Sequence, residues 1–276
     1  MIDNQDNPEG DVVPASLETL IGIAAPPIGW VMINNPARRN AMSRAMWDAM
    51  PRILDAFRER SDIRVLIFKG VGGKAFVSGA DISEFEQQRS SPDAEAAYTA
   101  ASQKAFGDIA SFHLPTLAMI EGACVGGGLA TALSCDMRIA ARGSRFGIPA
   151  AKLGIGYPLS GIEALVALVG PAQARQLLYT AELVSGETAL RIGLINELTE
   201  PESLAERVSD IAGMIARNAP LSQKAAKTAI AHVLAGGDAA SQDEVQAAID
   251  RAMNSADIKE GHYAFLEKRA PNFTGN

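Results

Sequence analysis

The stretch that most constrains this chain runs from residue 122 to residue 133, where residues 126–128 are all glycine. An apolar run over residues 115–120 predicts a buried strand before it, and an alanine- and leucine-rich run ending near Cys135 predicts a helix after it. Glycine lacks a β-carbon, so a ligand can approach its backbone closely. The first amides of a helix have no intrahelical acceptor and can bind a negative oxygen. A tight turn, with glycines for close packing, is the alternative that this segment alone leaves open.

A second motif follows a predicted strand over residues 64–70 and reads Lys74-Ala75-Phe76-Val77-Ser78-Gly79-Ala80-Asp81-Ile82. Together the two motifs strongly resemble the crotonase (enoyl-CoA hydratase/isomerase) superfamily, and the resemblance covers residues 17–275. It implies that the backbone N–H groups of Ala80 and Gly127 hold the thioester carbonyl of an acyl-CoA. Reactions next to a thioester pass through an enolate oxyanion, and two fixed donors stabilise that oxygen as its charge forms.

The same resemblance implies an architecture. We expect an α/β fold, a crotonase-like spiral of ββα turns with a C-terminal helical oligomerisation region. The predicted boundaries are a flexible N-terminal tail over residues 1–15, a spiral core with the acyl-CoA site over residues 16–200, and the helical region over residues 201–276. In the family this helical region builds a trimer, often paired into a hexamer. We therefore expect a homotrimer or homohexamer.

Composition narrows the classes of partner. The 276 residues are 47% hydrophobic, which is enough for a sizeable core, and the net charge of −7 argues against a nucleic-acid surface. The two cysteines suggest no disulfide framework. Residues 1–16 lack the basic and apolar segments of a signal peptide, and no run approaches the roughly 18 apolar residues that span a bilayer. We expect a cytoplasmic protein that binds neither nucleic acid nor membrane.

The resemblance also implies contacts with CoA. Residues 34–42 are similar to the family's Asn-x-Pro…Asn-Ala segment, which passes the CoA nucleotide, so Arg38 or Arg39 could meet phosphate there. A solvated surface arginine is the alternative for each. In the family, a phenylalanine and a lysine near the C-terminus reach the CoA of a neighbouring subunit. The expected contacts are Arg39, Ala41, Ala80, Asp81, Ile82, Ser83, Phe265 and Lys268. Because CoA is part of the substrate, we expect no separate cofactor and no metal.

Two positions depart from the family pattern. Its best-known hydratases add water with two glutamates, one three residues past the middle glycine and one after the proline of a Phe-Gly-x-Pro strand. Those positions are Ala130 and Ala150 here. General acid–base catalysis needs a group that exchanges a proton near neutral pH, and alanine has none. The sequence therefore argues against two-glutamate hydration and weakens an isomerase reaction that uses a carboxylate at the second position.

Tyr157 is the first candidate for the remaining chemistry. Residues 153–157 resemble the Leu-Gly-x-x-Tyr segment of methylmalonyl-CoA decarboxylases, a crotonase branch. There CO₂ would leave while the backbone donors hold the enolate, and a tyrosine could orient the carboxylate or protonate the enolate. The alternative is a tyrosine packed against the next helix. Glu163 is a second candidate, although Ser160 and Glu163 also fit a helix capping box.

The other ionisable residues favour structural or solvated roles. We expect Asp81 to order its loop, and none of the histidines has a partner at metal or triad spacing. The other residues for which we expect a structural or solvated role are Glu84, Glu86, Glu121, His113, His232 and His262. Three functions stay open: an acyl-CoA enzyme of this family, a malonyl-type decarboxylase that uses Tyr157, and a catalytically silent subunit that binds CoA thioesters. The acyl group is not determined by the sequence.

Overall fold

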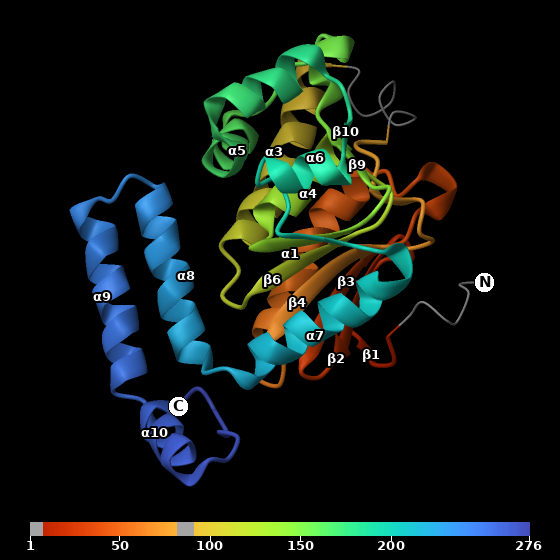
Figure 1. Cartoon of the computed structure of the whole chain (residues 1–276). Coiled ribbons are helices and arrows are strands. Elements are labelled where there is room, and N and C mark those ends of the chain that lie inside the picture. Colours follow the sequence, from red (N-terminus) through yellow and green to blue (C-terminus); the bar gives the residue numbers. More distant parts are fainter. Residues whose placement is uncertain (1–7, 82–90) are drawn as a thin grey trace.

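Two sheets and an outer layer of helices form the body of the molecule, and the computed structural model describes residues 8–81 and 91–276 (Figure 1). The larger sheet has seven strands in spatial order: β1 (Asp11–Val12), β2 (Leu20–Ala25), β3 (Ile28–Ile33), β4 (Val65–Gly70), β6 (Thr116–Ile120), β8 (Met137–Ala141) and β11 (Glu197–Thr199). The smaller sheet has four: β10 (Val184–Ser185), β9 (Arg145–Gly147), β7 (Ala123–Val125) and β5 (Ala75–Val77). Because β1 pairs with β2, residues 11 and 12 belong to the sheet rather than to a flexible tail.

Successive turns of the chain each contribute one strand to each sheet and then enter a helix. β4 and β5 precede α3 (Pro92–Ala110), β6 and β7 precede α4 (Gly127–Ser134), and β8 and β9 precede α5 (Leu159–Thr180). The strands of these turns pair in parallel within both sheets. This is the predicted spiral of ββα turns. One detail differs, because the short strand β7 of the second sheet lies between the apolar strand β6 and the glycine helix.

Helix α1 (Arg44–Arg58) supplies much of the core on one side of the larger sheet. Ser43 caps it, since the Ser43 hydroxyl accepts a hydrogen bond from the backbone N–H of Met46 at 3.2 Å. Large apolar side chains at helical spacing form its buried face: Met46, Trp47, Met50, Ile53, Leu54 and Phe57. These side chains belong to one cluster that includes strands of both sheets and helices α3 to α5.

Helix α7 (Leu204–Arg217) covers strands β4, β6 and β8 of the larger sheet. Its apolar face buries Leu204, Val208 and Ile211 against those strands, next to Ile67 and Ile139. The first helix of the predicted oligomerisation region is therefore part of the body. Within the described parts of the chain, no helix is both long and apolar enough to cross a membrane.

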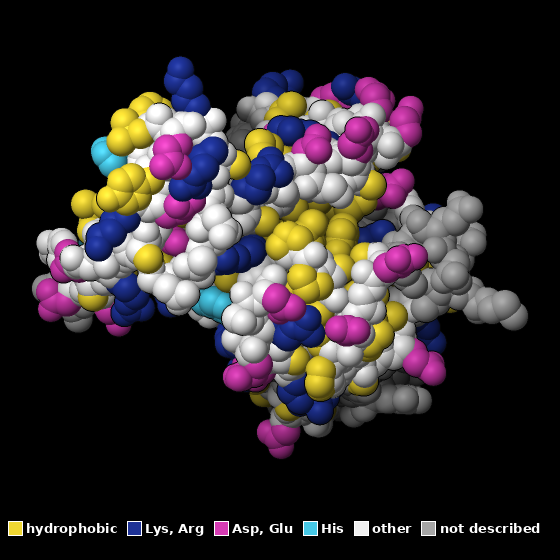
Figure 2. All heavy atoms as spheres, turned by 90° about the horizontal axis from the view of Figure 1, so that it is seen from below, with side chains coloured by type: hydrophobic (Ala, Val, Ile, Leu, Met, Phe, Trp, Pro, Cys, Tyr) yellow, Lys and Arg dark blue, Asp and Glu magenta, His cyan; other side chains and the backbone are white. Residues whose placement is uncertain are grey.

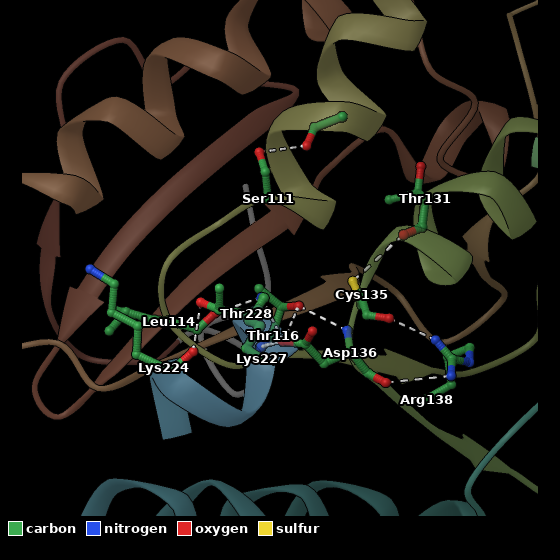
Figure 3. A network of polar contacts seen from close by, with 11 residues as sticks. Ser111, Leu114, Thr116, Thr131, Cys135, Asp136, Arg138, Lys224, Lys227 and Thr228 are labelled. Carbon is green, nitrogen blue, oxygen red and sulfur yellow. Dashed lines mark hydrogen bonds and ion pairs between the residues drawn. The ribbon is translucent and has the colours of Figure 1, made fainter. Parts of the chain in front are cut away.

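Helices α8 (Pro220–Leu234), α9 (Ala239–Met253) and α10 (Ala256–Glu267) form an arm that projects from the body (Figure 1). The body meets the arm at Lys227 of α8, whose ammonium donates to Asp136 at 2.8 Å and to the carbonyl of Leu114 at 3.0 Å (Figure 3). The same Asp136 carboxylate accepts from the backbone N–H of Thr116 at 2.8 Å. This network fixes α8 to the start of β6.

The last residues of the chain tie the far end of the arm back to the body. The buried carboxylate of Asp257, in the first turn of α10, accepts from the backbone N–H groups of Thr274 and Gly275 at 2.7 and 2.9 Å. Arg64, just before β4, donates to the carbonyl of Phe273 at 2.9 Å. The arm is thus joined to the body through α8 and through the residues that follow α10.

Candidate active site

The loop after β5 carries Ala80, and within residues 8–81 and 91–276 the amide of Ala80 has no acceptor. Ala80 forms an isolated parallel bridge with Met42. In this bridge the N–H of Met42 donates to Gly79 at 2.9 Å, and the N–H of Asp81 donates to Met42 at 3.0 Å. The bridge thus uses the carbonyl of Gly79 and the N–H of Asp81, but not the N–H of Ala80 that lies between them. Among the described residues, no acceptor pairs with the Ala80 N–H itself.

Gly127 begins α4, directly after an N-cap glycine with a positive φ. Gly126 has φ 56° and ψ −117°, and its N–H donates to the carbonyl of Gly147 at 2.9 Å. Such a conformation favours a residue without a β-carbon. Gly127 is the first helical residue, so its N–H has no intrahelical acceptor, and none of the side chains that the structure describes caps it.

The structure brings these two unpaired amides side by side. A β-carbon placed on Gly127 would lie 3.9 Å from the carbonyl carbon of Gly79, which is bonded to the Ala80 nitrogen. One placed on Gly126 would lie 3.9 Å from the α-carbon of Gly79. Two backbone donors from separate motifs therefore flank a single patch at the positive end of α4. An oxygen that develops negative charge is the group that such a patch can stabilise.

The positions of the two expected glutamates are apolar in three dimensions as well as in sequence. Ala130 is buried on α4, and Ala150 is half-buried in the short helix η3 (Pro149–Leu153). Neither methyl group can give or take a proton. The site therefore has its two backbone amides but no side-chain acid or base at positions 130 and 150.

Tyr157 is half-buried, and its hydroxyl is shielded from solvent and has no partner among the described residues. Its ring packs on Gly161, where a β-carbon would lie 2.5 Å from the ring. Burial raises the pKa of Tyr157 well above its usual value, with a smaller contribution from Cys124. The hydroxyl therefore stays protonated at neutral pH and can act as a hydrogen-bond donor.

We expect Tyr157→Phe to raise the free energy of unfolding by about 1 kcal/mol, because it removes a buried hydroxyl without a partner. If substrate supplies the missing acceptor, turnover falls in the same variant. Urea denaturation and steady-state kinetics measure the two effects. Tyr98→Phe is the matched control, and it should destabilise the fold because the Tyr98 hydroxyl bonds to Trp47 at 2.8 Å. A destabilised Tyr157→Phe protein would contradict the prediction.

The predicted CoA segment lies beside the Ala80 loop. Arg38 pairs with Asp81 at 2.7 Å, with side chains 52% and 9% exposed, whereas the neighbouring Arg39 is exposed and has φ 52°. Ala41 is buried and accepts from the amide of Asn35 at 3.0 Å. The ion pair fits the expected role of Asp81 in ordering its loop. The predicted positions Ile82, Ser83, Glu84 and Glu86 lie outside the described residues.

Asn40 holds this segment in place, and the sequence analysis missed it. Its buried side-chain amide donates to the carbonyls of Val71 and Ala75 at 3.0 and 2.7 Å, and its oxygen accepts from the N–H of Asn35. Its φ of 56° is one that asparagine adopts more readily than most residues. That tolerance is the signal that could have found it.

Phe265 and Lys268 lie on the arm. Phe265 is 82% exposed on α10, and Lys268 ends that helix in a left-handed conformation with φ 54°. Both are on the part of the chain that projects from the body (Figure 1). This placement leaves them open to a neighbouring molecule.

Several other candidates take structural positions. Glu163 is exposed on α5, and the predicted capping box with Ser160 is wrong, because Pro158 is the N-cap of that helix and no side chain caps it. His232 bonds to Ser241 at 2.7 Å, which joins α8 to α9. His113 is half-buried, and burial, with Lys224, Arg58 and Lys227 adding to it, lowers its pKa below the usual value.

We expect His113 to make the fold less stable in mild acid. Its folded pKa lies below the unfolded value of about 6.5, so the unfolded chain binds the proton more readily. The free energy of unfolding should fall as pH drops through about 6.5, until the folded group titrates too. Urea denaturation at neutral and acid pH measures this drop, which His113→Gln should reduce. An equal drop in the His113→Gln protein would refute the assignment.

The family model for enoyl-CoA hydratase/isomerase matches residues 25–276. The chain belongs to the enoyl-CoA hydratase/isomerase family. It is 38% identical over 255 residues to the crotonyl-CoA hydratase of Syntrophomonas wolfei, covering 87% of this chain and 92% of the relative. It is 35% identical over 240 residues to the short-chain-enoyl-CoA hydratase of Clostridium acetobutylicum, covering 87% and 91%. A crystal structure of an enoyl-CoA hydratase/carnithine racemase from Magnetospirillum magneticum superposes with a TM-score of 0.89 at 31% identity, covering 95% and 97%.

Family membership and the crotonase fold agree with the resemblance that the two motifs carry. This chain is an enzyme of the enoyl-CoA hydratase/isomerase family, with an α/β fold and C-terminal helices. The comparisons give no support to the methylmalonyl-CoA decarboxylase branch that residues 153–157 suggest.

Proposed function

We propose that this enzyme binds an acyl-CoA thioester with its carbonyl oxygen between the amides of Ala80 and Gly127, and that the reaction passes through a thioester enolate. The observation that carries this proposal is that the amides of Ala80 and Gly127 lie close together and have no acceptor among the described residues. Two fixed donors stabilise the enolate oxygen more than the uncharged carbonyl, so they lower the barrier to forming it.

The proposed chemistry does not use a pair of side-chain carboxylates. Ala130 and Ala150 occupy both positions where such groups would stand, so proton transfer must come from substrate, water or another side chain. Tyr157 is the residue that we propose for it, since its hydroxyl is protonated and has no partner in the part of the chain that the structure describes. The two relatives named above are hydratases, which makes hydration the first reaction to measure.

We further propose that the CoA moiety lies along two segments, one with Arg39 and Ala41 and one with Asp81, Ile82 and Ser83. In this proposal Phe265 and Lys268 of a neighbouring subunit complete the site. A homotrimer or homohexamer would supply that neighbour. Large apolar side chains on the arm support self-association, since Ile230, Val233, Leu234, Met253 and Leu266 are exposed. A cytoplasmic location stays a prediction.

A hollow beside the arm fits the same proposal. Apolar side chains gather there between the arm and the body (Figure 2). A cavity of about 630 Å³ opens between α8, α5 and strands β6 and β8, with Leu117, Leu133, Ile215 and Ile230 in its walls. A neighbouring subunit that covered this surface would remove it from water.

The deciding experiment measures turnover of crotonyl-CoA and of methylmalonyl-CoA by the purified protein, with thioester binding recorded in parallel. Turnover with either thioester, lost when the Gly127 amide is removed, supports the proposal. CO₂ release without hydration would favour a decarboxylase and make Tyr157→Phe decisive. Fast hydration that survives Tyr157→Phe would overturn the role of that residue. No binding of any CoA thioester would overturn the proposed function.

A further inference from the structure

Trp47 is a large buried side chain that stands next to the proposed oxyanion site. It lies on α1 and is 1% exposed. A β-carbon placed on Gly127 would lie 3.4 Å from Cζ2 of its indole and 3.9 Å from the carbonyl carbon of Gly79. The outer edge of the indole and the peptide that carries the Ala80 amide therefore lie on the same side of Gly127.

Hydrogen bonds lock the indole in this position. Its Nε1–H donates to the hydroxyl of Tyr98 on α3 at 2.8 Å, and that hydroxyl donates to the carbonyl of Met42 at 3.4 Å. The same Met42 carbonyl accepts from the N–H of Asp81, next to Ala80. Phe106, also on α3, meets the indole edge-on with the ring centroids 5.0 Å apart. Trp47, the wall of this site, is thus linked through Tyr98 and Met42 to the loop that carries the Ala80 amide.

A thioester held by the two amides brings its first acyl carbons close to this wall. Its carbonyl oxygen would sit about 2.9 Å from each amide nitrogen, and the carbon next to the carbonyl lies only two covalent bonds farther on. The buried indole is held by its hydrogen bond to Tyr98, which is itself bonded to Met42, and by an aromatic contact, so moving it aside costs free energy. A longer acyl chain that ran along this side of Gly127 would need the space that the indole fills.

We propose that Trp47, held by Tyr98, sets the length of the acyl group and restricts this enzyme to short-chain acyl-CoA thioesters. The inference rests on the proposed function, because it takes the thioester carbonyl to lie between Ala80 and Gly127. In this arrangement Trp47 sets specificity by closing space, and Tyr98 is a positioning residue that acts through the indole.

The test is calorimetric binding of butanoyl-CoA and decanoyl-CoA, saturated thioesters whose binding needs no turnover. The wild-type protein should bind butanoyl-CoA more tightly. Trp47→Leu opens space beside Gly127 and should shift the ratio of the two affinities toward decanoyl-CoA by about tenfold or more. Tyr98→Phe keeps the ring but removes the acceptor of the indole N–H, so it should shift the ratio in the same direction by less.

Trp30→Leu is the matched control, because Trp30 lies on β3 and packs with the α7 side of the larger sheet. It should leave the ratio unchanged. Thermal unfolding shows which variants are folded, and Tyr98→Phe carries the test if Trp47→Leu is not. An unchanged ratio in the folded variants, or a wild-type preference for decanoyl-CoA, would overturn the inference while leaving the proposed function standing. Absence of binding to either thioester would overturn both.

Discussion

Gly127→Pro is expected to lower kcat by about 10²- to 10³-fold, because it deletes one of the two proposed oxyanion donors. Proline has no backbone N–H, and it is well tolerated at the first position of a helix, which Gly127 occupies. The preceding residue is Gly126, whose lack of a β-carbon eases the restriction that proline places on its neighbour. The change therefore removes the donor with little cost to the fold.

Gly127→Ala is the control, since alanine keeps the N–H. Its β-carbon would meet Trp47 at 3.4 Å, an ordinary van der Waals contact. A reaction-independent measurement accompanies the kinetics: the infrared carbonyl stretch of bound ¹³C-labelled butanoyl-CoA should shift to lower frequency in the wild-type protein, and less in Gly127→Pro. Equal activity of the proline and alanine variants would show that this amide is not a donor to the transition state.

The second large effect concerns the next residue. Gly128→Ala is expected to cost about 3 kcal/mol or more of unfolding free energy, because the new methyl group has no room. Its β-carbon would lie 2.1 Å from the carbonyl oxygen of Val77 and 2.7 Å from the Val77 β-carbon. The clash is with backbone of β5 rather than with the end of a flexible side chain. Relieving it must separate α4 from the strand that leads to Ala80.

Gly107→Ala gives the matched comparison. Gly107 also lies in a helix, α3, but a β-carbon there meets nothing within 4 Å. This change should stabilise the protein by roughly 0.5–1 kcal/mol, since alanine is the better helix former. Urea denaturation of the two variants at one protein concentration measures both effects. Similar stabilities for Gly128→Ala and Gly107→Ala would mean that α4 does not pack on β5 as described.

Local signals predicted much of the fold. A capping serine at Ser43, followed by Met46, Met50 and Leu54 at helical spacing, is a pattern that predicts α1, and those apolar residues are buried in the structure. Leu204, Val208 and Ile211 recur at helical spacing too, which predicts α7, and all three are buried there. These predictions worked because each depends on residues a few positions apart, which a helix brings onto one face.

Signals that depend on tertiary contact were missed or misplaced. Ser160 and Glu163 fit a capping pattern, yet α5 begins one residue before Ser160, with Pro158 as its N-cap. Nothing in the local sequence assigned α7 to the sheet rather than to the arm. The short strand β7 escaped prediction because a strand of a few residues is defined by its partners more than by its own pattern.

The residues of the candidate site also fall into two groups, those that local motifs predict and those that only tertiary contacts reveal. Ala80 and Gly127 were predicted because their motifs are contiguous in sequence and resemble a known family. Trp47 and Asn40 were not, since a buried tryptophan on an apolar helix face is typical of any core. Only the three-dimensional arrangement shows that Trp47 lies against Gly127, and that the Asn40 amide bonds to the carbonyls of Val71 and Ala75.

The two unpaired amides also affect how such an enzyme can evolve. Their N–H groups belong to the peptide bonds before Ala80 and Gly127, so among side-chain replacements only proline deletes either one. Mutations at neighbouring positions such as 130 and 150 can therefore add or remove acid–base groups while both donors persist. Codons for alanine and glutamate can differ by a single base, so a lineage can exchange one reaction for another in small genetic steps. Duplicated genes would then diverge in chemistry without passing through a protein that has lost these donors.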